Sequence, residues 1–163
     1  MASDPIDIEG LLEEGRHDAS EWTGLAPETV LGHMHLRVGD IAQARAFYGD
    51  IMGFETVAQM PQALFISAGG YHHHIGMNTW QSRNAPRPDA DTAGLRFFTI
   101  QFADQAALEP VLARLQTAGV AVERQGETFA LRDPWSNGVV LTSNAALSGE
   151  QIRRSDLSML SAK

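Results

Sequence analysis

The chain has 163 residues, enough for one domain that buries a core without cross-links. It contains no cysteine, which excludes disulfides, thiolate metal ligands and cysteine nucleophiles. A formal net charge of -8 argues against nucleic acids and anionic membranes, so we expect neither as a partner. Neither a signal peptide nor a membrane span is predicted, and we therefore expect a cytoplasmic protein.

The first 28 residues are predicted to form an acidic arm. A short helix is expected over residues 8–14, and the segment ends in Trp22-Thr-Gly-Leu-Ala-Pro-Glu28. We expect this arm to pack on the surface of a domain that spans residues 29–143.

That domain begins with a module over residues 29–80. Its first strand runs from Val30 to Val38 and leads into Asp40, which suits a helix N-cap because its short acceptor satisfies free amides of the first turn. A helix over residues 41–52 follows and closes at Gly53, where a left-handed residue belongs. Three further strands are predicted after it: Phe54–Ala58, Ala63–Ala68 and His72–Asn78.

A second module, over residues 94–143, follows a loop rich in proline, glycine and aspartate. Its strand over residues 95–102 leads into Asp104, and its helix over residues 105–118 closes at Gly119. Three strands follow again: Val120–Arg124, Thr128–Arg132 and Gly138–Thr142. Both modules have the order βαβββ, so the sequence predicts an α+β domain that arose by internal duplication.

The last 20 residues, 144–163, form a polar and serine-rich tail. A helical pattern is visible over residues 150–160. We expect this tail to lie at the periphery of the domain.

Five of the six histidines fall in two strand-like segments of the first module: His33, His35, His72, His73 and His74. Residues two apart in a strand point to one face, so His33 and His35 are expected to project together. The same alternation pairs His72 with His74 and turns His73 to the opposite face, where a structural role is expected. Converging imidazoles suit a transition-metal ion. We predict that His33 and His74 bind a metal, with His72 or His35 as a third ligand.

Other side chains are candidates for chemistry or for substrate contacts around this site. Tyr71, together with His35 and His72, is a candidate acid or base in catalysis. Five side chains are predicted to line a substrate cavity: Asn78, Trp80, Phe97, Thr99 and Val140. Apolar walls suit a planar aromatic ligand, but they are also what a core looks like. The histidines themselves could likewise be ordinary hydrogen-bonding residues on a polar wall.

The spacing of several motifs adds a family resemblance to this interpretation. His33 precedes Asp40 by seven residues, and Phe47-Tyr48 and Gly53-Phe54 follow. The second module ends in Asp133-Pro-Trp-Ser-Asn137, a predicted turn. Together these motifs resemble the vicinal oxygen chelate superfamily, which includes glyoxalase I, bleomycin-resistance proteins and extradiol dioxygenases. The resemblance implies a sheet-lined cavity built from the two modules, and pairing of two copies into a homodimer.

A closer resemblance is to the C-terminal half of the catechol-2,3-dioxygenase group. It rests on Gly32-His-Met-His-Leu36, on Phe65-Ile-Ser-Ala-Gly-Gly-Tyr-His-His-His-Ile-Gly76 and on Asn78-Thr-Trp80. The arm, with Trp22-Thr-Gly-Leu25, is similar to the linker between the halves of those proteins. The resemblance implies a small aromatic substrate and a divalent metal, iron or manganese first and zinc or nickel as alternatives.

The chain departs from the ligand set of the ring-cleaving relatives. Those proteins are expected to hold iron through a histidine on the first strand of each module and a glutamate on the last. His33 fills the first position, but Phe97 and Val140 stand at the other two, and neither can bind a metal. The resemblance places His74 where glyoxalase-type proteins carry a carboxylate ligand.

Three functions therefore remain open at the level of sequence. The first is a metal-dependent, dioxygenase-like enzyme acting on a hydroxyaromatic small molecule. The second is a metal-free protein that binds a small molecule, as resistance-type relatives do. The third is the non-catalytic half of a two-part dioxygenase.

Overall fold

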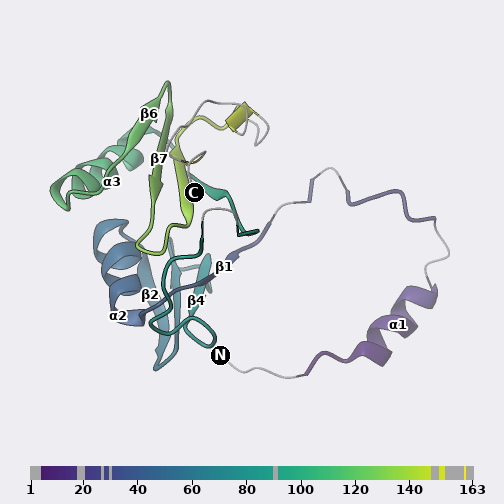
Figure 1. The fold of residues 1–163 in the computed structure, drawn as a ribbon. Coiled ribbons are helices and arrows are strands. Elements are labelled where there is room, and N and C mark those ends of the chain that lie inside the picture. The colour runs from purple at the N-terminus through teal and green to yellow at the C-terminus, as the bar shows by residue number, and fades with distance from the viewer. Residues whose placement is uncertain are drawn as a thin grey trace. The chain divides into compact units, whose positions relative to one another are not determined.

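The structure of the chain is a computed structural model (Figure 1). It describes residues 5–17, 21–26, 28–29, 31–89, 92–147, 151–152 and 160. The chain divides into two compact units, Met1–Gly32 and His33–Lys163. Among the described residues, no helix combines the length and apolar character needed to cross a membrane.

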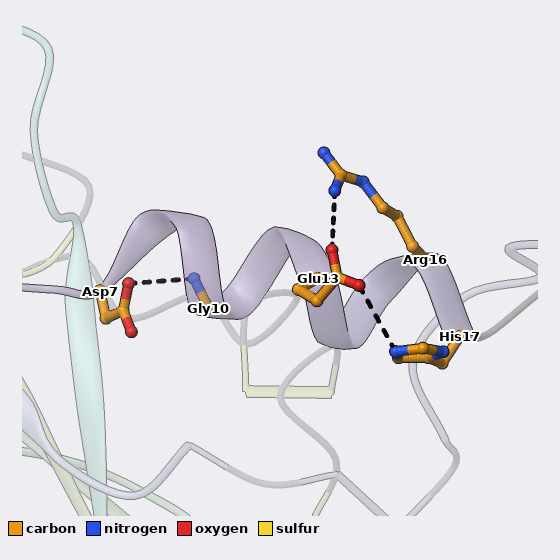
Figure 2. A network of polar contacts seen from close by, with 5 residues as sticks. All are labelled: Asp7, Gly10, Glu13, Arg16 and His17. Carbon is orange, nitrogen blue, oxygen red and sulfur yellow. Dashed lines mark hydrogen bonds and ion pairs between the residues drawn. The ribbon is translucent and has the colours of Figure 1, made fainter.

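The first unit contains one helix, α1 (Ile8–His17), in its described part. Asp7 accepts a hydrogen bond from the amide of Gly10 at 2.9 Å and so satisfies a free donor of the first turn. Glu13 forms an ion pair with Arg16 at 2.7 Å and lies 3.7 Å from the Nε2 atom of His17 (Figure 2). All of these side chains are exposed, so the pairs add little to stability. The helix extends to residue 17, beyond the predicted end at residue 14.

The first module of the second unit forms a four-stranded sheet with the order β1-β4-β3-β2. Its strands are β1 (Met34–Arg37), β2 (Glu55–Met60), β3 (Ala63–Ser67) and β4 (Ile75–Asn78). The outer strand β1 runs parallel to β4, whereas the other neighbours are antiparallel. The segments before β1 and β4 therefore emerge side by side at the same end of the sheet.

The second module repeats this arrangement in a sheet with the order β5-β8-β7-β6. Its strands are β5 (Phe97–Gln101), β6 (Glu123–Gln125), β7 (Thr128–Arg132) and β8 (Gly138–Thr142). Strand β5 is parallel to β8, as β1 is to β4. The two βαβββ modules and the α+β fold class are thus confirmed.

Both helices of the modules begin where the sequence predicts. Asp40 accepts a hydrogen bond from Gln43 at 2.7 Å, and Asp104 accepts one from Ala107 at 2.8 Å, so both act as N-caps. Gly53 is left-handed, with a φ of 91°. The helices are α2 (Ile41–Ala44), its continuation η1 (Arg45–Ile51) and α3 (Gln105–Thr117). Figure 1 shows α2 and α3 along the same side of the two sheets.

The first helix differs from the prediction because it widens into a π-helix over η1. The amide of Met52 bonds to the carbonyl of Phe47, five residues back. Phe47 and Tyr48 are both buried in this segment. Both aromatic side chains belong to the core of the domain.

One apolar cluster joins the two modules on the helix side of the sheets. Its fully buried members include Leu36, Leu64, Met77, Leu108, Leu115, Leu131 and Leu141. Polar contacts also cross between the modules. Arg114 donates to the carbonyls of Ile51 at 2.7 Å and Met52 at 3.2 Å, which closes the C-terminal end of η1.

The tail contributes to a second apolar cluster on the opposite face of the second sheet. Ile152 is 4% exposed and Leu160 is 2% exposed, and both pack against Ala130 and Val140. The expectation of a peripheral tail is therefore wrong for these two residues. Isolated apolar residues in a polar segment give no local signal that they are buried.

Candidate metal centre

The two histidine segments meet because β1 and β4 are neighbours. His33 directly precedes β1, and His72 to His74 directly precede β4. The amide of Met34 donates to the carbonyl of His74 at 2.9 Å, which ties the two segments together at their base. Convergence of imidazoles from these two segments, as predicted, follows from this parallel pairing.

Three histidines form the centre of this arrangement: His33, His72 and His73. Each offers one ring nitrogen, and these nitrogens all lie within 4.8 Å of one another. The ring centroids are 4.5 Å apart for His33 and His73, 4.7 Å for His72 and His73, and 6.0 Å for His33 and His72. We call these three residues the histidine triad. Nitrogens this close together make the triad a candidate to hold one metal ion.

The facing predicted for His73 and His74 is wrong. His73 points towards His33, whereas the Nδ1 atom of His74 accepts a hydrogen bond from the amide of Ala68 at 3.2 Å. The reason is that β4 begins only at Ile75, after a turn at the left-handed Gly69 and Gly70. Alternation of side chains holds only inside the strand, so it does not extend back through residues 72 and 73.

His73 is the buried member of the triad. It is 8% exposed, and neither of its ring nitrogens has a hydrogen-bond partner of good geometry within the described part of the chain. Burial, and then the neighbouring imidazoles of His33, His72 and His35, lower the pKa of His73 below its usual value. The neutral form of its imidazole is therefore favoured, and this is the form that binds a metal.

His35 lies beside the triad without being part of it. Its ring centroid is 5.2 Å from that of His33 and 5.7 Å from that of His73. Phe65 stands on the same face of the sheet, 5.1 Å from the ring of His73 and 6.5 Å from that of His35. His35 is exposed, so it can reach a group bound at the triad from the solvent side.

Tyr71 packs against two histidine rings at the edge of the centre. Its ring centroid is 4.2 Å from that of His72 and 4.7 Å from that of His74. The side chain is half-exposed. Tyr71 therefore packs beside the ring of His72 while part of its side chain stays exposed.

The predicted cavity residues do not all approach the histidines. Asn78 ends β4, where its side chain accepts a weak hydrogen bond from the amide of Trp80 at 3.4 Å. Trp80 is 68% exposed. Thr99 is exposed on β5, whereas Phe97 and Val140 belong to the second apolar cluster under the tail. Val140 is fully buried there and offers no surface to a ligand.

A buried polar network surrounds Asp133 in the second module. The sequence predicted the turn that begins at this residue, but not the rest of the network. The carboxylate of Asp133 accepts from the amides of Trp135 at 2.9 Å and Asn137 at 2.8 Å, as a turn-forming residue does. It also accepts from the side chain of Asn137 at 2.7 Å and the hydroxyl of Tyr48 at 2.9 Å. Because Tyr48 lies in the first module, this carboxylate links the modules. No local pattern reveals such a contact, although a tyrosine at a core position requires a buried acceptor.

The family model of the "Glyoxalase/Bleomycin resistance protein/Dioxygenase superfamily" matches residues 30–140. The chain belongs to this superfamily. Two solved members share the fold at low sequence identity. The lactoylglutathione lyase of Agrobacterium tumefaciens is 23% identical, with a TM-score of 0.53, over 72% of this chain and 95% of that one. A glyoxylase/bleomycin resistance protein/dioxygenase domain from Frankia sp. is 18% identical, with a TM-score of 0.57, over 70% and 96%.

One curated superfamily member is much closer in sequence. The catechol-2,3-dioxygenase of Bacillus subtilis is 42% identical over 142 residues, which cover 86% of this chain and 49% of that protein. This chain therefore spans about half the length of that relative. Over that half, this chain is similar in sequence to the catechol-2,3-dioxygenase.

Proposed function

We propose that this chain is a metal-dependent member of the superfamily with extradiol dioxygenase-like activity on a hydroxyaromatic small molecule. One observation carries the proposal: the ring nitrogens of His33, His72 and His73 lie within 4.8 Å of one another. Its class of reaction is that of the Bacillus subtilis relative. The ring nitrogens of His73 lack a hydrogen-bond partner of good geometry in the described part of the chain, so one of them could donate its electron pair to a metal.

The histidine triad would hold the metal through three neutral nitrogens. Imidazole suits divalent iron, zinc and nickel, and manganese is the fourth candidate; iron or manganese fits the reaction class of the relative. When bound, the metal would supply Lewis-acid activation to two adjacent oxygens of the substrate.

The side chains around the triad have separate roles in this proposal. His35 faces the open side and moves a proton to or from the substrate hydroxyl. Tyr71 holds the ring of His72 and presents its hydroxyl at the edge of the site. Phe65 forms an apolar floor beside His73 and His35, against which an aromatic ring can lie.

A metal-free role in binding is the second candidate function. Within the described residues no carboxylate joins the triad, in contrast to the two-histidine, one-carboxylate set expected of ring-cleaving relatives. The chain also matches only half of its dioxygenase relative, so the role of a non-catalytic half is a further candidate.

A cytoplasmic location and a homodimer remain predictions.

Metal analysis of untagged protein tests the proposal. We expect about one equivalent of metal in the wild type, and loss of it in His33→Ala and His73→Ala, because each removes one of three ligands. His17→Ala is the matched control, since His17 is exposed on α1 and should leave the metal content unchanged. Wild-type protein that stays empty when supplied with Fe(II), Mn(II) and Zn(II) would favour the binding role. Oxygen uptake with catechols would then separate an enzyme from a metal-binding protein without turnover.

A further inference from the structure

His35 and Gly76 are direct partners across the β1-β4 pair. A Cβ atom added at Gly76 would lie 2.8 Å from Cε1, 2.9 Å from Nδ1 and 3.3 Å from Nε2 of His35. The imidazole ring of His35 therefore occupies the space that any side chain at position 76 would need. The backbone at Gly76 is outside the left-handed region, so only this close approach requires glycine here.

The second module provides an internal comparison for this pair. The equivalent partners across β5 and β8 are Thr99 and Val140. In the first module, the large side chain of His35 on the outer strand faces Gly76. In the second module, the smaller side chain of Thr99 faces Val140. Only the first module therefore has room for an imidazole at this place on the sheet.

We propose that Gly76 is the positioning residue for His35. The missing side chain lets the ring of His35 lie on the sheet beside His33 and His73, within reach of a ligand held at the triad. This inference rests on the proposed function, because the role of His35 requires a metal-bound ligand. The inference adds Gly76 to the proposed site. Gly76 has no functional group, so its substitution is expected to act only through His35.

Alanine at position 76 would displace the ring of His35 from its place on the sheet. His33, His73 and Phe65 surround it on the face of the sheet, with ring centroids at 5.2, 5.7 and 6.5 Å. Because His35 is exposed, we expect its ring to move away from the sheet towards solvent. None of the triad residues needs to shift, so metal binding should survive while contact between His35 and the ligand is lost.

Four proteins test this inference: wild type, Gly76→Ala, His35→Ala and the double variant. In metal-free protein, NMR signals of the His35 ring should shift in Gly76→Ala. With Co(II) bound, visible absorption titrations should give nearly equal metal affinities. Affinity of the Co(II) protein for the probe 4-nitrocatechol should fall about tenfold in Gly76→Ala, a typical effect of disturbing a partner next to a metal centre. Gly32→Ala is the matched control, because a Cβ there meets nothing within 4 Å.

The double variant provides the decisive comparison. In the His35→Ala background, Gly76→Ala should change probe affinity by less than about twofold, because the ring that it displaces is gone. Unchanged His35 signals, or an undiminished effect of Gly76→Ala in that background, would overturn the inference alone. Wild-type protein that binds no Co(II) would instead overturn the proposed function, and the ligand role of His35 with it.

Discussion

His73 is buried, and neither of its ring nitrogens has a hydrogen-bond partner of good geometry among the described residues, which is unfavourable for the metal-free protein. A buried polar group without a partner destabilises a protein by about 1–3 kcal/mol. A bound metal would remove this penalty for one nitrogen.

His73→Leu should therefore stabilise the metal-free protein. We expect the free energy of unfolding in urea to rise by about 1 kcal/mol, because the unsatisfied nitrogens are replaced by an apolar group of similar size. Metal should raise the melting temperature of the wild type but not of His73→Leu, since the ligand is gone. A large loss of stability in metal-free His73→Leu would show that the imidazole has a favourable partner in solution.

The lowered pKa of His73 predicts how the metal-free protein responds to acid. Below the ordinary histidine value of 6.5, the unfolded chain binds a proton at this position more readily than the folded chain. Stability should therefore fall as the pH drops from about 6.5 towards the lowered pKa of the folded state. This part of the pH dependence should be absent in His73→Leu, as urea titrations at a series of pH values would show. Equal slopes in both proteins would contradict the assignment.

At the scale of elements, the sequence correctly predicted the features that depend only on residues nearby in the chain. Asp40 and Asp104 cap their helices as predicted, because an N-cap depends on the next three residues alone. The start of β4 was mispredicted, because it depends on where β1 and β3 stop pairing with it. Because β4 begins at Ile75 rather than at the predicted His72, His73 lies in the triad in place of the predicted His74. The sequence thus predicted His33 and His72 near the centre, but not its buried member.

The contact between η1 and the turn after β7 should contribute strongly to stability. Tyr48→Phe removes one of four hydrogen bonds to the buried carboxylate of Asp133. We expect the free energy of unfolding at neutral pH to fall by about 2 kcal/mol, as for other hydrogen bonds to charged groups. Tyr71→Phe loses a hydroxyl at a half-exposed position and is the control, with a change below about 0.5 kcal/mol. Equal effects of the two substitutions would contradict the buried link.

Burial raises the pKa of Asp133, so protonation of this carboxyl is favoured in the folded protein. The folded state then binds more protons than the unfolded state above the ordinary value of 3.8. Taken by itself, the titration of Asp133 lowers the free energy of unfolding as the pH rises from 3.8 through the raised pKa of the folded state. Loss of the Tyr48 hydroxyl removes a bond that lowers this pKa, so Tyr48→Phe should steepen that fall.

At the scale of the whole molecule, the tail makes the two modules unequal. Ile152 and Leu160 cover the face of the second sheet that corresponds to the histidine face of the first. A Cβ atom at Gly138 would first meet the backbone oxygen of Arg96, and it would also lie 2.9 Å from a methyl group of Leu160, so glycine permits both approaches. The sequence could not predict this, since burial of two isolated residues depends on the packed sheet rather than on their neighbours in the chain.

Leu160→Ala should destabilise the protein in proportion to its burial. Leucine at 2% exposure replaced by alanine typically lowers the free energy of unfolding by about 2–4 kcal/mol. Leu95→Ala, at a half-exposed position, should lower it by less than about 1 kcal/mol. Urea unfolding measures both. A neutral Leu160→Ala would show that the side chain of Leu160 is not held on the sheet in solution.

X-ray absorption spectroscopy of the wild-type protein with one equivalent of Zn(II) tests the central claim most directly. We predict three imidazole nitrogens at about 2.0–2.1 Å from the metal. His73→Ala should lose one of them, whereas His74→Ala should retain all three. A spectrum that loses an imidazole in His74→Ala but not in His73→Ala would contradict the histidine triad as the metal centre.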